Sequence, residues 1–142
     1  EKDSPTDEVY GFDEIHEAVA DSDYVVIACP LTDATAGLFD EDVFQTMDPD
    51  AFLINVGRGP VVDTEGLVAA LRWNRIAGAS LDVVDPEPLP EDHPLWGMDN
   101  VFITPHNSGY SPVYYERRSD ILVRNVERLR EGNLNDLENR VV

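Results

Sequence analysis

Three side chains of types that bind anions and transfer protons each follow a short apolar stretch of the chain. His106 lies in "TPHNSG", Glu87 in "DPEPLP" and Arg58 in "NVGRGP". Imidazole is the usual general acid or base near neutral pH, and a carboxylate bonded to its second nitrogen fixes the tautomer and favours the protonated ring. The planar guanidinium of arginine matches a carboxylate with paired hydrogen bonds. Together these types are suited to proton transfer on a small carboxylic acid.

The local sequence leaves a plainer interpretation open for each of them. Glycines on both sides of Arg58 let the backbone approach a ligand, but this arginine could also pair with any of many surface carboxylates. Prolines on both sides of Glu87 restrict its backbone, yet it could be one more acid in a Pro-rich loop. Asp82 ends an apolar stretch, where a carboxylate is costly without a partner; that partner could be purely structural.

The remaining histidines and the cysteine are weaker candidates. His16 lies on the polar side of an amphipathic stretch and His93 in a polar loop. Cys29 is the only cysteine, so the chain forms no internal disulfide and offers no cysteine metal cluster. Cys29 is expected to end a strand against a ligand, because no local base would activate it as a nucleophile. No metal site is predicted.

Two alternating patterns predict the elements that position these residues. Short runs rich in Val and Ile predict strands buried on both faces, and the stretches between them predict helices. The runs cover 24–30, 51–57, 78–84 and 101–105, and the helical stretches cover 12–22, 40–47 and 63–75. This alternation predicts an α/β fold with a parallel sheet covered by helices on both sides. Ligands of such sheets bind beyond the carboxyl ends of the strands, where the candidate residues lie.

The last stretch predicts one long helix over 111–133. Ser111 is the expected N-cap, Pro112 the first helical residue and Gly132 the residue past the end. Tyr115, Leu122, Val126 and Leu129 form an apolar stripe at helical spacing. We therefore expect one domain over 1–110, followed by a helix and an extended tail over 111–142.

The charge narrows the possible partners. The chain has 142 residues, of which 29 are acidic and 10 basic, for a net charge of −19. Such a surface repels nucleic acid and anionic membranes, and no apolar run is long enough to span a membrane. We interpret the acidity and the single lysine as adaptation to a high-salt cytoplasm. The alternative is an ordinary acidic cytoplasmic protein.

Four stretches, taken together and in this order, resemble the signatures of the D-isomer-specific 2-hydroxyacid dehydrogenase family. They are "CPLTDATAGLFD", "MDPDAFLINVGRGPVVDTEGLVAAL", "IAGASLDVVDPEPLP" and "PLWGMDNVFITPHNSG". The resemblance implies part of a Rossmann-type doubly wound sheet, with a long C-terminal helix returning to a substrate domain. It also implies hydride transfer between NAD or NADP and a 2-oxoacid or D-2-hydroxyacid, and a homodimer.

The resemblance also implies roles for individual residues. Arg58 would hold the substrate carboxylate and carbonyl, His106 would be the acid/base, and Glu87 its carboxylate partner. Asp82 would bond the nicotinamide carboxamide. The positions implied to bind the cofactor are Cys29, Val56, Gly57, Arg58, Asp82, His106, Asn107, Ser108 and Gly109. Pro60 and Val84 depart from the residues common in the family and are expected to shape the substrate pocket.

The phosphate-binding loop of such proteins is absent from this sequence. No G-x-G-x-x-G occurs in the 142 residues, so the chain is expected to be the C-terminal portion of a longer enzyme and inactive as it stands. One alternative is a non-catalytic, NAD-sensing interaction protein, as in the co-repressor branch of the family. Another is a generic acidic α/β module such as a receiver domain.

Overall fold

The computed structural model describes residues 7–139, which divide into two compact units between Ser108 and Gly109. The first unit is an α/β unit, and the second consists of one helix and the segment after it. The predicted boundary lies close by, at residue 110.

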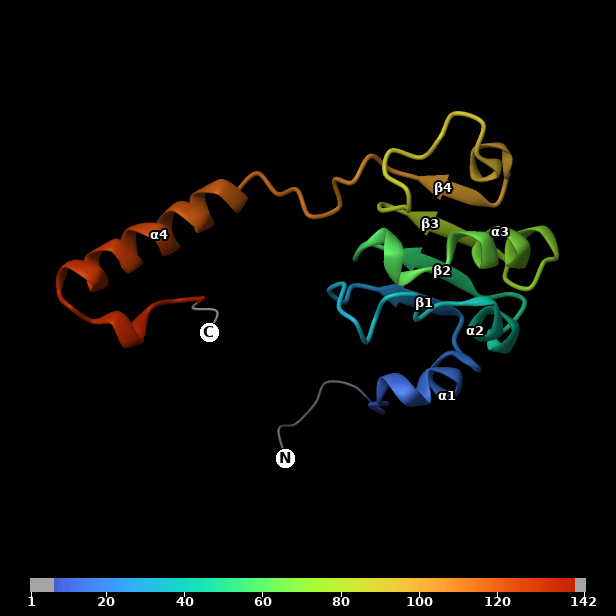
Figure 1. Ribbon diagram of the computed structural model, residues 1–142, viewed down its shortest axis with the longest axis horizontal. Coiled ribbons are helices and arrows are strands. Elements are labelled where there is room, and N and C mark those ends of the chain that lie inside the picture. The colour runs from blue at the N-terminus through green and yellow to red at the C-terminus, as the bar shows by residue number, and fades with distance from the viewer. Residues whose placement is uncertain (1–6, 140–142) are drawn as a thin grey trace. The chain divides into compact units, whose positions relative to one another are not determined.

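The first unit is built on a four-stranded parallel sheet. Its strands are β1 (Tyr24–Ile27), β2 (Phe52–Asn55), β3 (Gly78–Leu81) and β4 (Val101–Ile103). They lie side by side in sequence order, and all pairs are parallel (Figure 1). Each strand falls inside a predicted run but ends sooner, because the residues after it turn into the loops that carry the candidate site.

Helices lie where the sequence predicts them, one before β1 and one in each of the next two connections between strands. They are α1 (Ile15–Val19), preceded by a 3-10 turn, α2 (Glu41–Thr46) and α3 (Thr64–Arg72). Asp40 and Asp63 are the N-caps of α2 and α3, and each carboxylate accepts a hydrogen bond from a backbone N–H of the first turn. The core contains Val43 and Phe44 from α2, Leu67 and Leu71 from α3, and Leu53 and Leu81 from the sheet.

The prediction that helices cover both faces of the sheet is wrong within this unit. Leu53, Leu81 and their neighbours on one face are buried, but the large side chains that point the other way are exposed. Relative exposure is 69% for Tyr24, 60% for Val26, 41% for Phe52 and 67% for Phe102. Strands that follow one another across a sheet through right-handed crossovers place their connections on the same face. The opposite face therefore stays open and apolar in this unit.

The second unit contains α4 (Tyr114–Arg130) and a 3-10 turn at Leu134–Asp136. The predicted start of the helix is wrong: Val113 is the N-cap, and the carbonyl of Ser111 instead accepts the Tyr114 N–H in the preceding turn. Gly132 does follow the end of the helix, in the left-handed region at φ +80°. The turn at 134–136 replaces part of the extended tail, whose last residues, 140–142, lie outside the described residues.

The apolar stripe predicted on α4 is exposed. Tyr115, Leu122, Val126 and Leu129 are all exposed, and α4 has no buried residue. Instead, polar contacts join the helix to the segment after it: the Arg124 guanidinium binds the Glu138 carboxylate through two hydrogen bonds of 2.8 Å. Over residues 7–139, no helix has the length and apolar character needed to cross a membrane.

Candidate active site

His106 and Glu87 form a hydrogen-bonded pair at the carboxyl edge of the sheet. Nδ1 of His106 lies 2.9 Å from Oε1 of Glu87, and both side chains are about half exposed. His106 follows β4, whereas Glu87 lies in the loop after the neighbouring strand β3, so the sheet order brings them together. A carboxylate on Nδ1 holds the ring with Nε2 free to face solvent or a ligand.

Asp82 organises the loop that carries His106. Its carboxylate accepts hydrogen bonds from the Thr104 hydroxyl (2.6 Å) and from the backbone N–H groups of Asn107 (2.9 Å) and Ser108 (2.8 Å). Burial pushes the pKa of this carboxyl upward, but the hydrogen bonds from Ser108, Thr104 and Asn107 outweigh it and hold that pKa well below its ordinary value. Asp82 is therefore ionised at neutral pH although it is only 5% exposed.

The side chain of Asn55, at the end of β2, shapes the loop that carries Arg58. Its amide accepts the Gly57 N–H at 3.0 Å and donates to the Arg58 carbonyl at 3.1 Å. Arg58 itself is exposed, and its Nη1 donates to the carbonyl of Gly57 at 2.6 Å. Within residues 7–139 the guanidinium makes no other hydrogen bond, which leaves its remaining N–H groups for a ligand.

Two glycines let the loops after successive strands touch. A Cβ on Gly57 would lie 2.8 Å from the carbonyl oxygen of Cys29, and a Cβ on Gly59 would lie 2.0 Å from that of Val84. The loop after β2 is thus wedged between those that follow β1 and β3. Close backbone packing therefore explains why glycine is needed on both sides of Arg58. This reason does not depend on a bound ligand.

The other candidates lie along the same edge, with one exception. Cys29 is half-buried after β1, and Val56 is 37% exposed after β2. Gly109 belongs to the second unit, so its place relative to the edge is not defined. Among the described contacts, none joins Arg58 to His106, although both lie at the carboxyl ends of strands in one sheet.

Sequence reasoning missed two residues that build the site. Asn55 lies within the predicted strand run 51–57 and Thr104 within the run 101–105, and neither is among the candidate residues that the sequence predicts. Both are polar residues at or just past the end of an apolar run, which was the signal already used for Asp82. Asn55 is 1% exposed, a burial that an amide tolerates only with hydrogen-bond partners.

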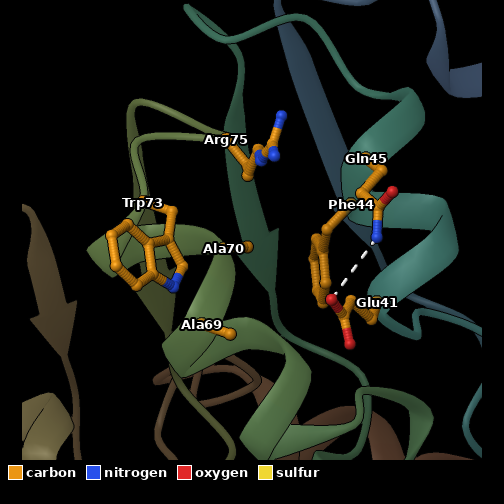
Figure 2. Close-up of a pocket in the computed structure, with 7 residues that line it drawn as sticks. All are labelled: Glu41, Phe44, Gln45, Ala69, Ala70, Trp73 and Arg75. Carbon is orange, nitrogen blue, oxygen red and sulfur yellow. Dashed lines mark hydrogen bonds between the residues drawn. The ribbon is translucent and has the colours of Figure 1, made fainter.

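A separate cavity lies between α2 and α3. It measures about 260 Å³ and is lined by Glu41, Phe44, Gln45, Ala69, Ala70, Trp73 and Arg75 (Figure 2). Gln45 donates a long hydrogen bond of 3.4 Å to Glu41 across one wall. None of the candidate catalytic or cofactor residues lines this cavity.

Cys29 and Val56 place a thiol and an apolar side chain just past the ends of β1 and β2, at the carboxyl edge of the sheet. The sequence contains no glycine-rich phosphate loop to hold the pyrophosphate. As for metals, no group of three or more His, Cys, Asp or Glu side chains within residues 7–139 could hold an ion.

The fold and this edge define a class: a Rossmann-like nucleotide-binding unit with a histidine–carboxylate pair at the ligand end of its sheet. Residues 1–108 match the family model described as "D-isomer specific 2-hydroxyacid dehydrogenase, NAD binding domain". The chain therefore belongs to the D-isomer-specific 2-hydroxyacid dehydrogenase family, as the sequence resemblance predicts. The family's NAD-binding domain agrees with the predicted cofactor, NAD or NADP, and excludes the receiver-domain alternative.

Relatives and solved structures support the same assignment. The chain is 42% identical over 123 residues to a glyoxylate reductase of Thermofilum pendens, covering 87% of this chain and 36% of the relative. It is 50% identical over 90 residues to the human glyoxylate reductase/hydroxypyruvate reductase, covering 63% of this chain and 27% of the relative. A D-isomer-specific 2-hydroxyacid dehydrogenase of Xanthobacter autotrophicus, solved with NADPH and MES, aligns with a TM-score of 0.83 and 39% identity over 93% of this chain and 53% of that one. The chain thus spans well under half the length of these two curated relatives.

Proposed function

We propose that this chain is the C-terminal part of an NAD(P)-dependent D-2-hydroxyacid dehydrogenase that reduces a small 2-oxoacid. The observation that carries the proposal is the His106–Glu87 pair of 2.9 Å, held at the ligand edge of a nucleotide-binding sheet. Asp82 places a buried carboxylate beneath the loop that carries His106. A histidine–carboxylate pair that was only part of the solvated surface would not need this support.

The residues divide the work between proton transfer and anion binding. Bound NAD(P)H supplies the hydride. Because Nδ1 of His106 faces Glu87, Nε2 is the atom that gives a proton to the substrate oxygen during reduction and takes it back in the reverse direction. Arg58 binds the substrate carboxylate and stabilises the charge that develops on the oxygen. Glu87 stabilises the protonated ring.

The rest of the nucleotide-binding domain is expected to precede this chain in the longer protein. The chain covers 36% and 27% of the two glyoxylate reductases described above. In the described residues β1 pairs with β2 on one side only. A groove of about 520 Å³ is lined by residues of α1, β1 and the segments around them, including Cys29, Leu38 and Phe39. The exposed apolar face of the sheet, beside this groove, needs to be covered by other apolar residues. We propose that a preceding strand and helix add here and bring the phosphate loop, with the second unit leading back to a substrate domain.

The full-length protein, with and without His106→Ala, provides the test. Reduction is measured with NADH and NADPH against glyoxylate, hydroxypyruvate, pyruvate and longer 2-oxoacids, at high KCl. We expect turnover of at least one 2-oxoacid, and a loss of about 10²–10⁴-fold in His106→Ala. Full reductase activity in that variant would overturn the proposed mechanism. Nucleotide binding without turnover of any 2-oxoacid would favour the non-catalytic, NAD-sensing alternative.

The 142-residue chain by itself serves as the second arm of this experiment. It lacks a phosphate loop, so we expect no turnover from it. We expect the full-length protein to be cytoplasmic and to form a homodimer. Sedimentation can measure the oligomeric state. Turnover by the isolated chain would show that the preceding part is not needed.

A further inference from the structure

His106 has a backbone conformation that its own side chain does not favour. Its φ is +51°, in the left-handed region where residues with a Cβ are disfavoured. Its backbone N–H donates to the Thr104 carbonyl at 3.0 Å, which closes a tight turn. Something outside the turn must hold this conformation, because the residue alone would relax to negative φ.

The contacts that hold it lie on both sides of His106 and converge on one group. Thr104 comes before the histidine, and Asn107 and Ser108 follow it. All three donate to the carboxylate of Asp82, two to Oδ1 and one to Oδ2. The N–H of Thr104 also donates to the Leu81 carbonyl at 3.0 Å, so the first anchor belongs to the sheet itself.

We propose that Asp82 is a positioning residue: its buried carboxylate clamps the Thr104–Ser108 loop so that His106 is held with Nδ1 against Glu87. Asp82 sits at the end of β3, one strand away from the loop it holds, and the Glu87 loop continues from the same strand. The carboxylate therefore holds the histidine loop through hydrogen bonds, next to the start of the loop that carries Glu87.

The clamp needs a carboxylate rather than any polar side chain. An ionised carboxylate is an acceptor at both oxygens, which matches three donors. An asparagine would turn an N–H toward the Asn107 or Ser108 N–H and leave a buried donor without a partner. The lowered pKa of the Asp82 carboxyl agrees with such an acceptor-only role. A bond to the nicotinamide, the role implied by resemblance, would have to share an oxygen with the clamp.

The consequence for catalysis rests on the function proposed above, but the clamp can be tested without turnover. We would compare the 142-residue chain with Asp82→Asn by NMR, through amide hydrogen exchange at Asn107 and Ser108 and through the ring ¹⁵N shifts of His106. In the unmodified chain we expect the neutral ring to carry its proton on Nδ1. In Asp82→Asn we expect exchange at both amides to be about tenfold faster or more, and the ring proton to shift toward Nε2.

Asp40→Ala is the matched control, because it also removes a carboxylate that accepts a backbone N–H, from the N-cap of α2. It should leave the exchange at Asn107 and Ser108 and the His106 tautomer unchanged. The clamp is refuted if a folded Asp82→Asn protein keeps both signals, or if Asp40→Ala alters them as much.

A second pair of variants tests the clamp if the Asp82→Asn protein does not fold. Thr104→Val removes one of the three donors, whereas Thr104→Ser keeps the hydroxyl. We expect a shifted tautomer in the valine variant and its restoration in the serine variant; equal signals in both would contradict the clamp. In the full-length enzyme Thr104→Val should lower kcat more than it changes KM. If the full-length protein turned over no 2-oxoacid, the proposed function would be refuted, but the NMR result on the clamp would remain valid.

Discussion

Nδ1 of His106 lies 2.9 Å from Oε1 of Glu87, although 19 residues separate them in sequence. The pair exists because β3 and β4 are neighbours and parallel, so the loops after them meet at one edge.

Replacing Glu87 by Gln should slow the proposed reduction of a 2-oxoacid by the full-length protein. Glutamine keeps the shape but loses the charge that stabilises the protonated imidazole, so we expect a fall in kcat of about 10- to 100-fold, less than for loss of the acid itself. Glu91→Gln is a suitable control, because Glu91 lies in the same loop region and makes no contact with His106 among the described residues, and it should retain the parent rate. A Glu87→Gln enzyme as fast as the parent would remove Glu87 from the mechanism.

Replacing Asp82 by Asn should destabilise the 142-residue chain in a pH-dependent way. The pKa of Asp82 is lowered in the folded state, so its stabilising effect is fully present above the unfolded value of about 3.9 and is lost as the pH falls below it. We expect a difference of about 2–3 kcal/mol in unfolding free energy at pH 7. Urea unfolding should show this difference narrowing below about pH 4; a difference that grew on acidification would contradict it.

Replacing Gly59 by Ala should destabilise the chain because the new Cβ would lie 2.0 Å from the Val84 carbonyl oxygen. The loops after β2 and β3 must then move apart, at a cost of about 1–3 kcal/mol in unfolding free energy. Gly97→Ala is the control, since nothing lies within 4 Å of a Cβ there, and should change stability by less than about 0.5 kcal/mol. Equal melting temperatures for the two variants would show that the close approach is not rigid.

Glu138 should titrate at unusually low pH. Hydrogen bonds from Arg124 are the main cause, with further attraction to Arg124 and Arg128, and they lower its pKa to about 2. A carboxyl ¹³C titration should show this midpoint in the parent chain and a return toward the ordinary value in Arg124→Gln. Because the pKa is lowered, the contact stabilises the second unit above the ordinary glutamate pKa and weakens as the pH falls toward 2.

Stability should rise with salt. A net charge of −19 on 142 residues produces self-repulsion that molar KCl screens. We expect the melting temperature to increase by about 5 °C or more between low and molar KCl. A melting temperature that stays constant or falls would refute adaptation to a high-salt cytoplasm.

Much of the fold could be read from local patterns. Runs rich in Val and Ile marked the four strands, and acids at 40 and 63 marked the starts of α2 and α3, because side-chain shape and capping act over a few residues. The start of α4 could not be read this way. Ser111 and Pro112 have the types typical of a helix start, but the chain turns there and the helix begins at Tyr114.

The candidate site, like the fold, could be predicted only in part from the sequence. The sequence by itself determined the residue types at the strand ends and, through four motifs in order, the family and its NAD-binding domain. Only the tertiary structure decided that the Asp82 carboxylate accepts hydrogen bonds from the loop of His106, that the Asn55 side chain bonds to the loop of Arg58, and that one sheet face stays open. These features depend on which strands are neighbours and on partners up to 26 residues apart. Strand order and register create such contacts, and local residue preferences do not encode them.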